Sequence, residues 1–206
     1  MRKSIIVLGL LLLTLPILKA QEGEYRFTLV LEPTISWMKS NNKSVSSGGS
    51  LPGYDVGVLF DYFFADNFGL ATGITVNTAG GKLEYPIYGE ANKQKQTYRL
   101  KYLELPIGMK LRSDDLHRIN IYGRFGFSPQ INIKASDNNG NNINNEVRLF
   151  DIGYHLGAGI EYSLGGRNAL VLGLLLNNGF SDITKRSGID DKSILNRLVF
   201  EFGFIF

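Results

Sequence analysis

The sequence contains no cysteine, two histidines and a single tryptophan among its 206 residues. Without cysteine the chain cannot form a disulfide, bind an iron–sulfur cluster or a Cys-ligated zinc ion, or use a thiol nucleophile. Most metal and redox chemistry is excluded with these, so we expect no metal and no cofactor. The composition is otherwise that of a folded domain, because 44% of the residues are hydrophobic and 12% are aromatic.

Long apolar runs are also scarce. After residue 20 the longest is Ala169 to Leu176, which is far shorter than the ~20 residues that a membrane-spanning helix needs. We therefore expect no transmembrane helix beyond the first twenty residues.

The one extended apolar segment lies at the N-terminus. Met1-Arg2-Lys3 is basic, residues 4–18 are almost entirely apolar, and Ala20 is a small residue where a cleavage site is expected. This arrangement is typical of a secretory signal peptide. A transmembrane anchor is the alternative, but an apolar run of ~15 residues is short for one. We predict a signal peptide over residues 1–20, cleaved after Ala20, and a single domain over residues 21–206.

The formal net charge of +3 arises in that segment. Three of the 22 Lys and Arg residues (Arg2, Lys3 and Lys19) lie there, so the remaining 19 equal the 19 Asp and Glu residues. A neutral mature chain has no basic excess to attract phosphate backbones, so nucleic acid is not an expected partner. No cysteine follows the signal, which also excludes the bacterial lipoprotein route.

The mature chain alternates between apolar and other residues with a period of two, the pattern of β-strands. The stretch 150–162 shows it most clearly, with only apolar residues at even positions and only Asp, Gly, His and Glu at odd ones. Residues 170–176 are apolar on both faces, but Gly173 and the following Asn177-Asn178-Gly179 argue against a helix. We expect eight strands, over residues 27–37, 54–64, 68–76, 103–111, 119–133, 150–162, 170–176 and 198–206.

The connections between these strands alternate between short and long. A transmembrane up-and-down barrel needs this asymmetry, because its periplasmic turns are short and its outer loops are long. The predicted turns cover residues 65–67, 113–118 and 164–168, and the predicted polar loops cover 38–53, 78–98, 134–149 and 177–194.

Periodicity alone does not say which face of each strand points into the barrel. Glycines such as Gly57, Gly108 and Gly157 share a face with the charged residues. The interior of an eight-stranded barrel is only wide enough for side chains to fill, so small residues mixed with a few long ones belong there. We therefore predict an all-β fold, an eight-stranded antiparallel up-and-down transmembrane β-barrel with its polar face inward. A secreted soluble β-protein with the faces reversed is the alternative.

Several stretches resemble a known family: YLELPIGMK (residues 102–110), GRFGF (123–127), DIG (151–153), GAGIEY (157–162) and the terminal Phe206. Together they are similar to the PorT-type outer-membrane β-barrel proteins of the Bacteroidota. The resemblance covers the whole mature chain and implies a barrel in the bacterial outer membrane. It implies no catalytic or binding residue. A role in type IX secretion is an alternative, because the grouping is named after one protein involved in that process.

The chain ends on alternating aromatic residues, Phe202, Phe204 and Phe206. This ending resembles the signal by which the barrel assembly machinery recognises its clients. That machinery is therefore an expected partner during biogenesis, and outer-membrane lipid is the expected surrounding of the finished barrel.

The predicted inward face carries many charges, and buried charges must be paired or hydrated. We predict an internal network of ion pairs and water that fills the barrel, with Arg124 and Arg197 neutralised by carboxylates such as Glu104 and Glu201. A barrel filled in this way should conduct poorly, and a narrow solute channel is the alternative. The candidate network consists of Glu32, Asp61, Glu104, Lys110, Arg124, Asp151, His155, Glu161, Arg197 and Glu201.

Enzymatic activity is not expected. His155 is the only histidine in a predicted strand, and so the only candidate general base of that type. Asp151 shares its face but lies ~13 Å away at ~3.3 Å per residue, too far to hydrogen-bond to it. Acylation or deacylation of lipid A, which the chain would share with some other eight-stranded barrels, is the enzymatic alternative.

The long connections carry mixed charge and aromatic residues, notably at 82–95 and 182–192. Exposed loops on a rigid scaffold commonly carry binding functions, so a protein or glycan partner is expected there. We predict a small integral outer-membrane protein with a structural or surface-interaction role. The alternatives are an accessory barrel of a PorT-like, type IX secretion system and a narrow solute channel.

Overall fold

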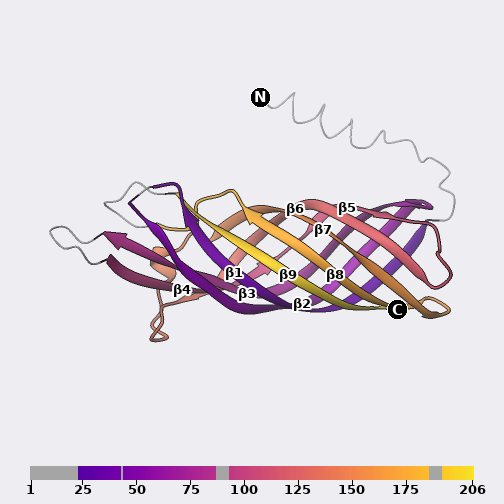
Figure 1. The fold of residues 1–206 in the computed structure, drawn as a ribbon, viewed down its shortest axis with the longest axis horizontal. Helices are drawn as coiled ribbons and strands as arrows, with labels where there is room; N and C mark the ends of the chain where they lie inside the picture. The colour runs from indigo at the N-terminus through magenta and orange to yellow at the C-terminus, as the bar shows by residue number, and fades with distance from the viewer. Residues whose placement is uncertain (1–22, 43, 87–92, 186–191) are drawn as a thin grey trace, which may run out of the picture.

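In the computed structural model, which describes residues 23–42, 44–86, 93–185 and 192–206, nine β-strands form one closed barrel (Figure 1). Each paired strand is antiparallel to its neighbours. The elements are β1 (Glu24–Ser40), β2 (Ser46–Ala65), β3 (Phe68–Pro86), β4 (Lys93–Glu104), β5 (Ile107–Arg112), β6 (Ile119–Ser136), the 3-10 turn η1 (Asn144–Glu146), β7 (Phe150–Gly165), β8 (Asn168–Gly179) and β9 (Ser193–Ile205).

β4 and β5 occupy a single place in the ring. Both pair with β3 on one side and with β6 on the other, while β1 closes the ring by pairing with β2 and β9. The interruption falls at Leu105 and Pro106, because proline has no N–H to donate to the ladder. Over the described residues the ring thus has eight places, which confirms the predicted eight-stranded antiparallel barrel.

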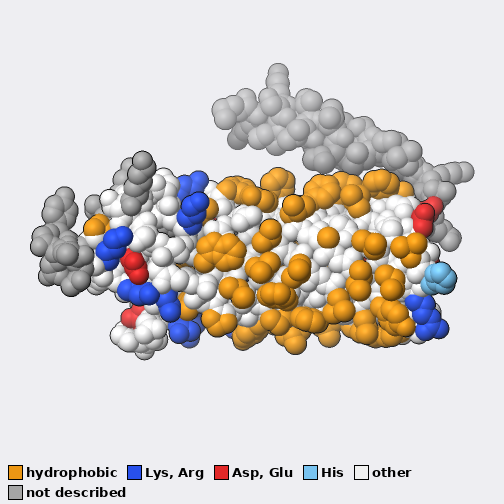
Figure 2. Space-filling view, viewed as in Figure 1, with side chains coloured by type: hydrophobic (Ala, Val, Ile, Leu, Met, Phe, Trp, Pro, Cys, Tyr) orange, Lys and Arg blue, Asp and Glu red, His pale blue; other side chains and the backbone are white. Residues whose placement is uncertain are grey.

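Apolar side chains face outward around the middle of the barrel. On β1, Leu29 and Leu31 are 53% and 59% exposed, whereas Val30 and Glu32 between and after them are 1% and 7% exposed. The predicted orientation of the faces is therefore confirmed. We call this outward-facing band the belt; Figure 2 shows it between two charged ends. The belt includes Leu29, Leu31, Val56, Val58, Leu70, Ile74, Leu103, Ile107, Ile121, Phe125, Phe127, Leu156, Leu172, Leu174 and Phe202.

The strands are longer than predicted at one end of the barrel. β3 runs to Pro86 and β4 starts at Lys93, where the sequence predicts a loop over residues 78–98. β2 starts at Ser46, inside the predicted loop 38–53. Both loop predictions are wrong. In β3 and β4 alternation continues with its chemistry reversed, so that apolar residues point inward and polar residues outward. The added part of β2 consists mostly of Ser and Gly, which give no apolar alternation to predict a strand.

We call the two ends of the barrel the turn end and the loop end. Connection lengths do not alternate strictly, because β3 and β4 are separated by no more residues than β5 and β6 are. The additional residues lie in the strands instead. At the turn end β2, β5, β7 and β9 end and β3, β6 and β8 begin, and at the loop end β1, β3, β6 and β8 end and β2, β4, β7 and β9 begin.

An apolar core fills the barrel at the loop end. Leu83 and Tyr98 face inward from β3 and β4 and are at most 1% exposed. The two longest connections add side chains to this core: Ile143 and Val147 from 137–149, and Ile183 from 180–192. The loop-end core comprises Met38, Val45, Ala79, Leu83, Tyr85, Tyr98, Leu100, Tyr102, Ala135, Ile143, Val147, Ile183 and Leu195.

The turn end has short turns, and the last residue of the chain is hydrogen-bonded to the barrel wall there. Gly165 and Gly166 have φ angles of 116° and 62°, in the left-handed region that glycine adopts without strain. The amide of Phe206 donates to the carbonyl of Phe27 at 3.0 Å, and the two rings lie 6.2 Å apart between centroids. The C-terminal aromatic residue is thus part of the barrel wall.

Among the described residues no helix has both the length and the apolar character to span a membrane. The predicted signal peptide, residues 1–20, lies outside the described residues.

Candidate functional site

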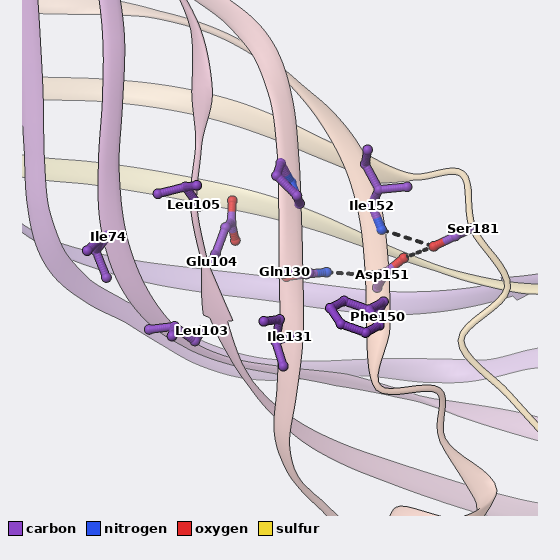
Figure 3. Close-up of a pocket in the computed structure, with 11 residues that line it drawn as sticks. Ile74, Leu103, Glu104, Leu105, Gln130, Ile131, Phe150, Asp151, Ile152 and Ser181 are labelled. Carbon is purple, nitrogen blue, oxygen red and sulfur yellow. Dashed lines mark hydrogen bonds between the residues drawn. The ribbon is translucent and has the colours of Figure 1, made fainter. Parts of the chain in front are cut away.

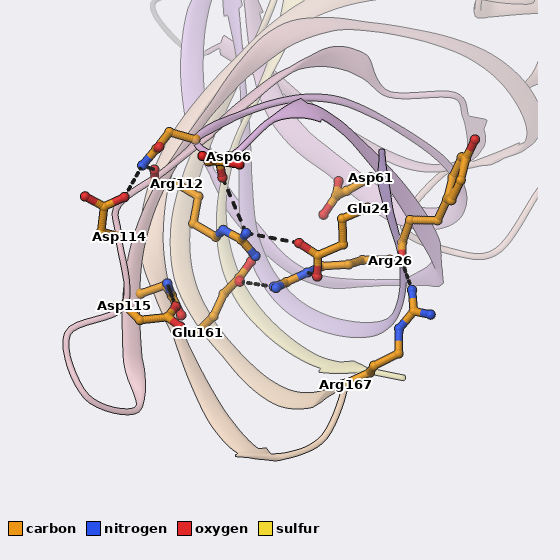
Figure 4. A network of polar contacts seen from close by, with 12 residues as sticks. Glu24, Arg26, Asp61, Asp66, Arg112, Asp114, Asp115, Glu161 and Arg167 are labelled. Atoms are coloured by element: carbon orange, nitrogen blue, oxygen red, sulfur yellow. Dashed lines mark hydrogen bonds and ion pairs between the residues drawn. The ribbon is translucent and has the colours of Figure 1, made fainter. Parts of the chain in front are cut away.

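The barrel interior is occupied by clusters of charged side chains, beginning at the turn end. Arg26 donates to Glu24 at 2.7 Å and to Glu161 at 2.8 Å, and Arg112 donates to Glu24 at 3.1 Å. Figure 4 shows Glu24 and Arg26 of β1 converging with Arg112 and Glu161 from two other strands. The turn end is therefore crossed by ion pairs between β1, β5 and β7.

Lys110 lies one step deeper. Its ammonium group is 2.6 Å from a carboxylate oxygen of Asp61 and 2.7 Å from one of Glu161, and all three side chains are at most 4% exposed. The same ammonium lies 4.8 Å from the centroid of the Tyr122 ring, a cation–π geometry. One buried lysine thus links β2, β5 and β7.

Arg124 and Glu201 form the next buried pair, across the lumen from β6 to β9. The Tyr122 hydroxyl donates to the second oxygen of Glu201 at 2.5 Å. Both oxygens of this carboxylate are therefore satisfied, as a charge in a low-dielectric interior requires.

Arg197 carries the cluster nearest the loop end. Its guanidinium donates to Asp55 at 2.8 Å and also to Glu104. Asn77 and Asn177 donate to the two oxygens of Glu104 at 2.7 and 3.2 Å. Arg197 is 2% exposed, and its two carboxylate partners come from β2 and β4. Both arginines that the sequence places on the inward face are thus paired with inward carboxylates.

Asp151 lies at the edge of this arrangement and is held by neutral groups. Gln130 donates to one of its oxygens at 2.5 Å, and the Ser181 hydroxyl donates to the other. Figure 3 shows Gln130 and Ser181 directed at Asp151 from either side. Asp151 is therefore positioned by hydrogen bonds from β6 and from the connection after β8.

Glu32 differs from the other interior acids. It is 7% exposed, and its carboxylate makes no hydrogen bond or ion pair with any residue that the structure describes. It lines a cavity of about 40 Å³ together with Asp55, Arg124, His155 and Arg197. A cavity of that size has room for one or more water molecules, which would solvate the carboxylate.

His155 has a serine partner and no carboxylate partner. Its Nδ1 lies 2.9 Å from the Ser128 hydroxyl, and its Nε2 has no hydrogen-bond partner among the described groups. Asp151, which sequence spacing places too far away, is bonded to Gln130 and Ser181 instead. The arrangement lacks the carboxylate that orients the histidine of a hydrolytic triad.

Sequence reasoning missed part of the turn-end cluster. Glu24 and Arg26 precede the predicted first strand at residue 27, and Arg112 follows the predicted fourth strand by one residue. Continuing the same alternation backward from Thr28 would have placed Arg26 on the inward face. Tyr122 lies on the predicted polar face, but nothing in the sequence marks it as the donor to Glu201.

The family model described as "Outer membrane protein beta-barrel domain" matches residues 21–185. No curated protein matches the sequence. Two solved structures are similar in fold: Neisserial surface protein A, at 15% identity and a TM-score of 0.53 over 87% of this chain and 95% of that chain, and OprG from Pseudomonas aeruginosa, at 13% identity and a TM-score of 0.55 over 88% and 95%. The apolar belt and the paired interior agree with these findings, which locate the barrel in the outer membrane. The chain belongs to the family of outer membrane proteins with a β-barrel domain.

Proposed function

We propose that this protein is a closed, non-conducting barrel whose loop end serves as a rigid interaction surface outside the cell. In outer-membrane barrels the short turns face the periplasm, so the loop end lies outside. The observation that carries the proposal is the loop-end core, which fills the barrel above the belt with apolar side chains.

The two longest connections are attached to this core by backbone hydrogen bonds. The amide of Ile143 donates to Ala135 at 3.0 Å, the amide of Arg148 donates to Ile183 at 2.9 Å, and the amide of Ile183 donates to Ser193 at 2.9 Å. The segments 137–149 and 180–185 are therefore joined to the strands and to each other at the loop end. A surface built in this way supports binding without a large ordering cost.

Three further features of the proposal rest on the sequence. We infer that residues 1–20 are a cleaved signal peptide and that Phe202, Phe204 and Phe206 are read by the barrel assembly machinery. We also infer that the protein is not an enzyme, which is supported by the burial of His155 and by the bonding of Asp151 to Gln130 and Ser181 rather than to this histidine. No observation on the described residues favours a secretion-accessory role or a solute channel over this proposal.

Conductance tests the closed state. The purified mature chain in a planar bilayer should show no stable channel, whereas a stable and large open channel would overturn the proposal. Heat-modifiable gel mobility of the same preparation serves as the control for a folded barrel.

Surface labelling tests the orientation of the barrel in the membrane. Because the chain has no native cysteine, an introduced cysteine is the single labelling site of each variant. Asn138→Cys at the loop end should react with an impermeant maleimide on intact cells. Arg118→Cys at the turn end, also exposed, should react only after the outer membrane is permeabilised. The opposite labelling pattern would show that the loop end does not face outward.

A further inference from the structure

A cationic groove lies on the outer wall just beyond the belt at the loop end. It has a volume of about 340 Å³ and is lined by Arg99 and Lys101 of β4, by Lys134 of β6 and by Tyr54 and Thr78 of the neighbouring strands. We call it the basic groove. Among the residues that the structure describes, no acidic side chain lines it.

The three cations are arranged unfavourably for the protein alone. Lys101 and Lys134 are directly opposite each other in the antiparallel ladder, and Arg99 follows two residues along β4 on the same outward face. Like charges directly opposite each other on two strands destabilise a sheet. None of the three makes an ion pair with a residue that the structure describes. An anion with several oxygens placed between them would remove this repulsion, and guanidinium and ammonium groups suit phosphate.

A second groove lies on the same two strands, on the belt side of the basic groove. It has a volume of about 610 Å³, and its walls are mostly belt residues such as Leu103, Ile131 and Phe150 (Figure 3). Leu103 is two residues from Lys101 on the outward face of β4, and Ile131 is three residues from Lys134 on β6. We call it the apolar groove. Its polar floor contains Glu104 and Asp151, both acids, which disfavour an anion there.

Along the barrel, the apolar groove and the basic groove follow each other in the same order as the acyl chains and the head group of a membrane lipid. The apolar groove lies within the belt, at the depth of acyl chains, and the basic groove lies at the belt's outer edge, at the depth of head groups. Basic side chains at the edge of an apolar surface attract anionic lipid head groups. In the orientation proposed above, on which this inference rests, the turn end faces the periplasm, so this edge lies in the outer leaflet.

We propose that the grooves together bind an anionic lipid of the outer leaflet through its phosphate and one of its acyl chains. The phosphate lies between Arg99, Lys101 and Lys134, and an acyl chain lies against Leu103, Ile131 and Phe150. The binding site is on the lipid-facing wall, so it does not depend on whether the barrel conducts or on what the loop end binds.

The experiment compares lipids that differ only in their phosphates. The probes are lipid A, dephosphorylated lipid A with the same acyl chains, and inorganic phosphate. Binding to the mature chain in detergent micelles is measured by native mass spectrometry, with heat-modifiable mobility as the check on folding. The wild type should bind lipid A about tenfold or more tightly than its dephosphorylated form. Inorganic phosphate at the same concentration should not compete.

Two triple variants isolate the basic groove. Arg99→Gln/Lys101→Gln/Lys134→Gln should lose the preference for the phosphorylated lipid while retaining heat-modifiable mobility. The matched control removes the same charge from exposed positions outside the groove, by Lys39→Gln, Lys93→Gln and Arg118→Gln, and should keep the preference.

Phe150→Ala tests the apolar groove separately. Phe150 is 67% exposed, so its truncation leaves the barrel interior intact. This variant should bind both lipid A forms several-fold more weakly while keeping the preference between them. The proposal is overturned if the basic-groove variant keeps the preference. It is also overturned if inorganic phosphate competes as well as lipid A does, since the site would then recognise phosphate without lipid.

Discussion

The belt region and the loop-end region are built from the same strands with opposite chemistry. Along β4, Leu103 faces outward in the belt, whereas Lys101 and Arg99 face outward beyond it. Inside, the change runs the other way: Glu104 lies in the charged network, while Tyr98 and Leu100 lie in the loop-end core. Along β4 the period of two is unbroken across the change.

This reversal follows from the solvent outside each region. Lipid surrounds the belt, so apolar side chains face outward there and the interior takes the polar ones. Water surrounds the loop end, so apolar side chains are buried inside, as in a soluble barrel. The belt interior is therefore held by paired charges and the loop end by apolar packing, and the two should respond to different substitutions.

Removing Arg197, one of the buried cations of the belt interior, should have the largest effect on the free energy of unfolding. Arg197→Leu leaves Asp55 and Glu104 buried without their shared partner, and the expected loss in free energy of unfolding is about 3–5 kcal/mol. The urea midpoint of the heat-modifiable band reports it. Arg118→Leu, at an exposed turn-end position, should leave the midpoint unchanged. Equal midpoints for both variants would mean that ion pairs do not stabilise the belt interior.

Truncating an apolar side chain of the loop-end core should destabilise the loop end and leave the belt region folded. Ile183 is 1% exposed in the loop-end core, and Ile183→Ala should cost about 2–5 kcal/mol through the cavity it leaves. We expect faster proteolysis within residues 137–149 while the boiled and unboiled bands still differ in mobility. Leu116→Ala, a residue 57% exposed at the turn end, is the control. Loss of the mobility shift in the Ile183 variant would show that the two regions unfold together.

The cost of a lysine on the outer surface should show directly whether lipid or water surrounds that position. Leu172 lies in the belt, and Leu172→Lys should cost about 2–4 kcal/mol near the bilayer midplane. Ser50→Lys, at an exposed position on the loop-end part of β2, should leave the free energy of unfolding nearly unchanged. Refolding yields into vesicles across a urea series measure both. A similar cost at the two positions would contradict the location of the belt edge.

The smallest effect is expected at the tip of the connection between β6 and β7. The side-chain amide of Asn141 donates to Asp137 at 2.9 Å and holds the pKa of that carboxyl below its usual value of 3.8. The backbone amides of Asn139 and Asn141 donate to it as well. The stabilisation of the tip is therefore present above pH 3.8 and is lost as the pH falls through the lowered pKa.

NMR shifts of the Asn139 and Asn141 amides measure this titration. They should show an inflection below pH 3.8 in the wild type and none in Asp137→Asn. An inflection at or above pH 3.8 would mean that the tip does not favour the ionised carboxylate.

The sequence by itself determined the eight places of the antiparallel ring and the orientation of the strand faces around its middle. Alternation along 150–162 identifies a strand without any contact, because successive side chains point to opposite faces. Glycines beside charges show which face is crowded, since the inside of a small barrel has no room for more. The need to pair Arg124 and Arg197 also follows from the sequence, because a buried charge without a partner is too costly.

Only the tertiary structure decided which partners meet. Arg197 lies between Asp55 and Glu104, and Arg26 reaches Glu161, because ring closure and stagger bring distant strands to the same height. The loop-end core likewise depends on the tertiary structure. The inward apolar residues of this core alternate along the strands with the same period as the outward apolar residues of the belt. The pattern therefore does not reveal that water replaces lipid outside the loop end. That change of solvent depends on height along the barrel, which the folded ring alone defines.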